Sequence, residues 1–118
     1  MNVEELRAYC LTKPHVTEDF PFDETTLVFK VGGKMFALTS LEKFPPAVNL
    51  KCAPHYALEL RETYEAIRPG FHMNKKHWNT IAYQNNISKQ LLLKLIDHSY
   101  DLVVKSLSKK VKIELGFI

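Results

Sequence analysis

Apolar residues recur along this chain at two spacings, and each spacing predicts a different kind of element. Recurrence at every third or fourth position gives one face of a helix, and recurrence at every second position gives one face of a strand. The helical pattern covers 2–12, 54–67 and 88–107. The strand pattern covers 25–31, 34–39, 47–52, 71–73, 77–83 and 110–115. This mixture predicts a small α+β domain.

Each of the three predicted helices begins with a recognisable N-terminal signal. Asn2 is followed three positions later by Glu5, which is the arrangement of a capping box. Pro54 stands where a first-turn proline is tolerated, and Ser88 is a suitable N-cap. The predicted buried positions are Ala57, Leu60, Tyr64 and Ile67 in the middle helix and Leu92, Ile96, Tyr100, Val103 and Leu107 in the last.

Gly32-Gly33 lies between two β-rich runs and predicts a two-residue hairpin turn. Counting outward from this turn gives the facing pairs Val31 with Lys34, Phe29 with Phe36, and Leu27 with Leu38. We expect the larger apolar side chains to face the core. The core side would then hold Leu27, Phe29, Phe36 and Leu38, and the second, partly apolar side Val28, Lys30, Met35 and Ala37.

The remaining segments are less decisive. In 47–52 we expect Val48, Leu50 and Cys52 to point inward, and Asn49 and Lys51 outward. In 77–83 either face can be the core, one with Trp78, Thr80 and Ala82, the other with His77, Asn79, Ile81 and Tyr83. We expect 15–24 to be a polar loop, 41–46 a linker and 110–115 a short edge strand.

The length of 118 residues suits one domain, 1–118, with a core that needs no disulfide or metal. No apolar run approaches the roughly 20 residues that span a bilayer, so we expect no membrane contact. The segment Met1 to Glu5 is acidic and lacks the apolar run of a signal peptide, which predicts a cytoplasmic location. There, Cys10 and Cys52 should be small buried residues. We expect a monomer.

Catalytic and metal-binding patterns are weak. Cys52 and His55 are three positions apart, but a zinc site needs about four ligands and no second pair is suitably spaced. A catalytic thiolate needs a base and an oxyanion donor as well. Gly32-Gly33 is not followed by a helix, so it does not form a phosphate loop. We expect neither catalysis, nor a metal, nor a cofactor.

The net charge of +3 is unevenly distributed. Residues 1–24 contain six carboxylates against Arg7 and Lys13, so the rest of the chain is basic, which is compatible with polyanion binding. Lysines on turns suit phosphate contacts, which give salt-sensitive affinity without sequence preference. Trp78 suits either stacking on a base or a place in the core. The candidate nucleic-acid contacts are Lys30, Lys34, Lys51, Arg68, Asn74, Lys75 and Lys76.

Five stretches occur in an order and spacing typical of one family. They are DFPF at 19–22, VFKVGGKMF at 28–36, LKCAP at 50–54, PGFHMNKKHW at 69–78, and Ser99-Tyr100. Together they resemble the MmcQ/YjbR family of small bacterial proteins. The resemblance implies a CyaY-like fold, with an antiparallel sheet covered by an N-terminal, a middle and a long C-terminal helix. It also implies weak, non-specific DNA binding, through likeness to a double-wing domain, with phosphate contacts at Lys30, Lys34, Lys51, Lys75 and Lys76.

Two positions depart from the family pattern. Asp23 stands where a glycine commonly follows Pro-Phe, and Ala53 replaces an acidic cap, which should weaken the helix start by ~1 kcal/mol. The iron chemistry of frataxin-type relatives of the fold is not expected, because only Glu4 and Glu5 place acidic side chains on the first helix.

Two other functions stay open. A protein-interaction or regulatory adaptor would expose an apolar patch around Val28, Met35 and Ala37. A small-molecule or metal-binding module would have a closed pocket with convergent polar groups. DNA binding would instead be favoured by clustering, on one face, of Lys34, Arg68, Lys75 and Lys76.

Overall fold

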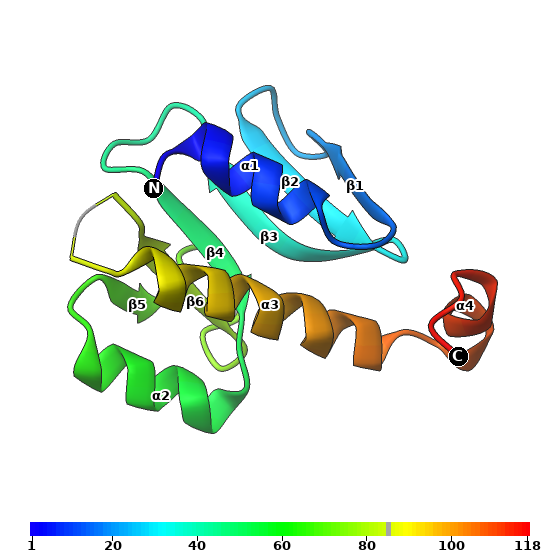
Figure 1. Cartoon of the computed structure of the whole chain (residues 1–118). Coiled ribbons are helices and arrows are strands. Elements are labelled where there is room, and N and C mark those ends of the chain that lie inside the picture. Colours follow the sequence, from blue (N-terminus) through cyan, green and yellow to red (C-terminus); the bar gives the residue numbers. More distant parts are fainter. Residues whose placement is uncertain (85) are drawn as a thin grey trace.

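The computed structural model describes residues 1–84 and 86–118. In chain order its elements are α1 (Val3–Leu11), β1 (Val16–Asp19), β2 (Thr26–Val31), β3 (Lys34–Ser40), β4 (Ala47–Lys51), α2 (Pro54–Thr63), β5 (Ile67–Pro69), β6 (Trp78–Ala82), α3 (Lys89–Ser106) and α4 (Lys109–Glu114). The strands form one antiparallel sheet in the order β1-β2-β3-β4-β6-β5. Helices α1, α2 and α3 share one core on one face of it (Figure 1). The predicted α+β fold with a long C-terminal helix is confirmed.

The predicted helix starts are confirmed. The Asn2 side chain accepts from the Glu5 amide at 2.8 Å, and the Glu5 carboxylate accepts from the Asn2 amide at 3.3 Å. Ser88 caps α3 with a bond of 3.1 Å from the amide three residues on. Helix α2 begins at Pro54, and Ala53 before it provides no side-chain cap, as the departure from the family pattern predicts.

The β2–β3 hairpin departs from the predicted register beyond the pair Lys30 and Met35. Val31 faces Lys34 as predicted, but Phe29 faces Ala37 instead of Phe36. A β-bulge adds one residue to β3 at this point, and every pair beyond it is shifted by one position. Leu27 therefore faces Thr39, and its predicted pairing was wrong.

The bulge also changes which side chains face the helices. Phe36 and Ala37 both belong to the helix-side core, whereas Leu38 lies on the other face, so the predicted sides of Ala37 and Leu38 were wrong. The β3–β4 pairing ends at Ala37, and Ser99 of α3 completes it beyond that point. The Ser99 hydroxyl donates to the Phe36 carbonyl at 2.6 Å and accepts from the Lys51 amide at 2.8 Å. Ser99 is fully buried, and from helix α3 it links the backbones of β3 and β4.

Strands β4 and β6 alternate between the two faces. Val48, Leu50 and Cys52 are buried against the helices, as predicted. The face of β6 that the sequence left open is settled, because Ile81 and Tyr83 join the helix-side core. Trp78 packs on the opposite side of the sheet in a small cluster with Val28, Leu38, Met35 and Met73.

Two segments, one after α1 and one after α2, adopt structures other than those predicted. Strand β1 lies inside the predicted loop 15–24, where Glu18 forms a 2.6 Å ion pair with Arg7 of α1. Helix α2 ends at Thr63, because Tyr64 is already extended, with φ −120° and ψ 118°. Ile67 is buried as predicted, but within strand β5 instead of the helix.

Two further strand predictions were wrong. Residues 71–73 form a turn, and 110–115 fall mainly in helix α4. The Ser108 side chain accepts from the Val111 amide at 3.2 Å and so caps a helix where alternation predicted a strand. Beyond α4, the Phe117 ring contacts the ring of Tyr100 and closes the end of the core. No described helix has the length and apolarity that a membrane span requires.

Candidate binding face of the sheet

The side of the sheet opposite the helices is bordered by three loops, 20–25, 41–46 and 70–77. We call it the open face. Residues that face one another across neighbouring strands point to the same side, so Trp78 and Thr80 place their partners Lys51, Asn49 and Arg68 on it. The open face is therefore defined by Thr26, Val28, Lys30, Met35, Leu38, Asn49, Lys51, Arg68, Trp78 and Thr80.

The 70–77 loop folds back onto the open face and is bonded to it at Phe71. The Phe71 amide donates to the Thr80 hydroxyl at 2.8 Å, and the Phe71 carbonyl accepts from the Asn49 side chain at 3.3 Å. The Thr80 hydroxyl in turn donates to Asn49 at 2.5 Å. These bonds use the Phe71 backbone and leave its ring 53% exposed. The loop thus presents an aromatic ring at a fixed place above the sheet.

Two further features hold the ends of this loop. A Cβ on Gly70 would lie 2.8 Å from the Trp78 Cβ, so only glycine fits this close approach. On the other side, Arg61 of α2 donates to the Asn79 side chain at 2.7 Å and to the carbonyls of Lys75 and Trp78. Arg61 therefore connects α2 to the end of the loop and to β6.

Two adjoining hollows lie on the open face. The first, of about 490 Å³, is half-open and bounded by all three loops. Its apolar lining includes Phe22, Met35, Leu38, Phe71 and Met73, and its polar lining includes Asp23, Thr26, Ser40 and Asn49. The second, of about 530 Å³, extends toward β5 and includes Arg68 and Glu65. Lys43, Ala47 and Thr80 border both hollows.

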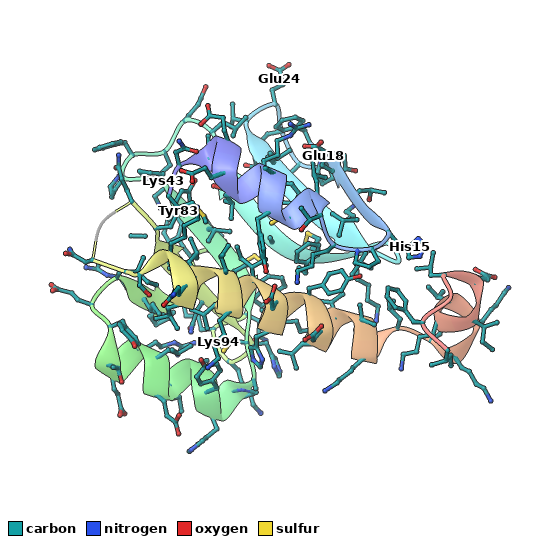
Figure 2. All side chains as sticks on the ribbon, in the orientation of Figure 1. His15, Glu18, Glu24, Lys43, Tyr83 and Lys94 are labelled. Atoms are coloured by element: carbon teal, nitrogen blue, oxygen red, sulfur yellow. The ribbon has the colours of Figure 1, made fainter. Side chains whose placement is uncertain are left out.

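Lys43 marks the boundary between the hollows. Its ammonium lies 4.2 Å from the centre of the Phe71 ring, which is a cation–π contact. Figure 2 shows Lys43 beside the loop between β3 and β4, away from Lys94 on α3. Four phenylalanines of the three loops are also exposed, and a concentration of exposed aromatic rings is typical of binding surfaces. They are Phe20, Phe22, Phe44 and Phe71.

The predicted cations of the strands do not all share one face. Lys51 and Arg68 lie on the open face, as does Lys30, whose ammonium is 3.7 Å from the Asp19 carboxylate. Lys34 points to the helix side, where its ammonium donates to the Ser106 carbonyl at the end of α3, at 3.1 Å. Lys34 therefore stabilises the C-terminus of α3 and is separated from the others.

The three candidate nucleic-acid contacts in the 70–77 loop have different roles. Asn74 accepts from the amides of Lys76 and His77, at 2.9 and 3.3 Å, and so shapes the turn. The Lys75 ammonium donates to the Gly70 carbonyl at 2.9 Å and closes the loop. Lys76 is exposed. Of the loop residues, Lys76 thus presents the least engaged charge.

Three acidic side chains on the helix side are paired with a lysine or arginine. Glu5 lies 3.2 Å from Lys89, Glu18 pairs with Arg7, and Asp97 pairs with Lys13. A hydrogen bond from Lys89 lowers the pKa of Glu5, and one from Arg7 lowers the pKa of Glu18. In the described residues, no ion pair engages Lys43, Lys51, Arg68 or Lys76. These four cations without an ion pair lie on or around the open face, whereas Lys34, which also has none among the described residues, lies on the helix side.

The thiols and histidines form no nucleophile–base pair in the described chain. Burial raises the pKa of Cys10 to about 12 and that of Cys52 to about 11, which disfavours a thiolate. The His55 ring nitrogen lies 2.9 Å from the Glu59 carboxylate. Burial lowers the pKa of His98, whose ring nitrogen accepts from the Ala53 amide at 3.1 Å. Among the residues that the structure describes, no group of three or more His, Cys, Asp or Glu side chains could hold a metal ion.

A family model described as YjbR matches residues 11–102. The chain belongs to the YjbR family. Two relatives are the Escherichia coli proteins YbdF (O157:H7), 41% identical over 107 residues that cover 91% of this chain and 88% of the relative, and YjbR (strain K12), 32% identical over 110 residues that cover 93% of each. Both are described as uncharacterized, so YjbR membership establishes ancestry and fold and leaves the function to the site.

Two crystal structures are similar to this YjbR-family chain. A Deinococcus radiodurans protein with a DUF419 domain is 42% identical, with a TM-score of 0.91 over 98% of this chain and 88% of its own. A Pseudomonas syringae protein is 26% identical, with a TM-score of 0.76 over 87% of this chain and 99% of its own. The YjbR fold seen here is therefore shared with solved relatives.

Sequence reasoning missed several residues of the open face. Lys43 lies in a segment that the sequence predicts to be a linker. Asn49 looks like an ordinary outward strand position, and Thr80 lies on a strand whose core face the sequence leaves open. Phe22 and Phe71 each stand next to a proline or glycine. An aromatic residue in such a turn is the signal that could have identified them, because a turn cannot easily bury a large side chain.

Proposed function

We propose that this YjbR-family protein is a non-catalytic DNA-binding protein and that DNA lies on the open face. One observation carries the proposal: four cations that have no ion-pair partner in the described residues lie on or beside this face, Lys51 and Arg68 from strands and Lys43 and Lys76 from loops. Phosphate contacts of this kind give weak, salt-sensitive binding without sequence preference.

This proposal differs from the expectation from the sequence, in which lysines on hairpin or turn tips contact the phosphates. The Lys34 ammonium is engaged by the end of α3, and the Lys75 ammonium by its own loop. An arrangement in which the open face carries the cations explains the same basic composition. It also brings the exposed Phe71 ring among the charges.

The features expected of the other two functions are formed only in part. Val28 and Ala37 are fully buried, so the apolar surface of this face is exposed at Phe22 and Phe71 instead of at the two predicted residues. The first hollow is half-open, whereas the small-molecule alternative predicted a closed pocket. The charges of the open face therefore remain the strongest functional signal in the described chain.

Fluorescence anisotropy of a labelled DNA duplex, titrated at several salt concentrations, tests the proposal. Four phosphate contacts give a slope of log affinity against log salt of about −3 to −4. Arg68→Gln/Lys76→Gln should make the slope less negative by about 2, at about 1 per lost contact. The matched control is Lys94→Gln/Lys105→Gln, which removes the same charge from exposed positions of α3.

Two results would contradict the proposal. One is the absence of binding at low salt by protein whose circular dichroism shows it to be folded. The other is an equal loss of slope in both double variants, which would mean that net charge matters and that the open face does not.

A further inference from the structure

We propose that the open face prefers single-stranded DNA and that the first hollow, between Phe22 and Phe71, takes an unpaired base. The inference rests on the proposed function, because it concerns which form of DNA the same face selects. It adds a recognition element that phosphate contacts alone do not provide, since these would accept a duplex as readily.

The lining of the first hollow matches the chemistry of a base. Met35, Leu38 and Met73 provide an apolar, polarizable floor, and Phe22 and Phe71 provide aromatic walls. A base has apolar faces and a polar edge, so it can stack on the rings while its edge meets hydroxyl and amide groups. In a duplex the bases are stacked inside the helix and cannot reach such a hollow without being extruded. The volume of about 490 Å³ lies within the range of ligand sites.

Polar groups around the hollow give the base an orientation. Asp23 places a carboxylate in the lining, where its oxygen already accepts from the amides of Thr25 and Thr26 at 2.9 and 2.6 Å. A carboxylate suits the amino edge of a base and repels a phosphate. The phosphate should therefore lie on the other side, against Lys43.

The second hollow continues the path. It adjoins the first at Lys43 and contains Arg68, so a strand leaving the first hollow meets two cations in succession. The Lys43 ammonium is already held over the Phe71 ring at 4.2 Å. Stacking rings beside a cationic groove are the combination that binds single strands without sequence preference. Two adjoining hollows thus fit successive nucleotides.

A labelled oligonucleotide, measured alone and after annealing to its complement, tests the inference. At one salt concentration the single strand should bind more tightly than the duplex. Phe71→Ala should weaken single-strand binding by about 5- to 150-fold, which is the range for loss of one stacking contact. Its salt slope should stay unchanged, because stacking neutralises no phosphate. Phe71→Trp should retain the affinity, and Phe71→Leu should not.

Leu58→Ala is the matched control. Leu58 lies on α2 and is 54% exposed, against 53% for Phe71, so both substitutions remove a similarly exposed apolar side chain. Trp78, the only tryptophan, packs with Met35 and Met73 under the first hollow, and its fluorescence should change on adding the single strand and less on adding the duplex.

The outcomes separate the two proposals. Equal affinity for both DNA forms, or equal effects of Phe71→Ala and Leu58→Ala, would overturn the single-strand inference and leave DNA binding by the open face intact. Absence of binding to either form would overturn both.

Discussion

Replacement of Ser99 by alanine should destabilise the protein by far more than its small change in volume suggests. The hydroxyl is fully buried and connects the Phe36 carbonyl to the Lys51 amide, at 2.6 and 2.8 Å. Ser99→Ala leaves both backbone groups without a partner in the sheet. An unsatisfied buried group costs about 1–3 kcal/mol, so the two together give a loss of about 2–6 kcal/mol. Domains of this size are stable by only about 5–15 kcal/mol.

Urea unfolding followed by Trp78 fluorescence measures this loss as a fall in the midpoint at unchanged slope. Ser106→Ala is the control, because the Ser106 hydroxyl only donates to the Val103 carbonyl within the exposed end of α3. It should change the free energy of unfolding by less than about 0.5 kcal/mol. A loss of that small size in Ser99→Ala would refute the reasoning, since it would show that β3 and β4 are held together without the hydroxyl.

Three other predictions follow from buried and clamped side chains. Arg61→Ala should destabilise the protein by about 2–4 kcal/mol, because the buried Asn79 side chain and two backbone carbonyls lose a charged donor. In thermal unfolding, Arg61→Lys should restore only part of the lost stability. Burial lowers the pKa of His98 from 6.5. The unfolded chain therefore binds more protons below that pH, and stability should fall as pH decreases from about 7 to 5. His98→Gln should remove this fall, whereas His55→Gln, at an 89% exposed side chain, should retain it. Cys10 and Cys52 should both resist a thiol reagent at pH 8 until urea unfolds the chain, because burial raises their pKa values to about 12 and about 11.

Local chemistry was sufficient to predict the helix starts and the hairpin turn. The bonds that cap α1 and α3 run between residues three positions apart, so their pattern is visible in the sequence. The Gly32-Gly33 turn has positive φ at both residues, 59° and 81°, which follows from the same short-range logic.

The bulge in β3 could not be predicted this way. Its extra residue is accommodated because Ser99, far along the chain, supplies a hydrogen-bond partner for the Phe36 carbonyl and for the Lys51 amide. Strand β5 depends similarly on pairing with β6, although its residues continue the helical apolar stripe of α2. In each case a contact between distant segments outweighs the local pattern.

The open face was predicted only in part. Strand alternation places Lys51 outward, and that expectation is confirmed by its pairing with Trp78. The fold-back of the 70–77 loop could not be anticipated, because it depends on bonds from Phe71 to Asn49 and Thr80 on two different strands. That fold-back supplies one wall of the first hollow and puts Phe71 beside Lys43.

The most direct test of the account is a map of amide chemical shifts in isotope-labelled protein as DNA is added at low salt. The open face as binding surface predicts changes concentrated in the 41–46 and 70–77 loops and in β4 and β6, with α1 and the outer side of α3 unaffected. Changes confined to the Gly32-Gly33 tip and α4, or spread evenly over the helix side, would contradict it.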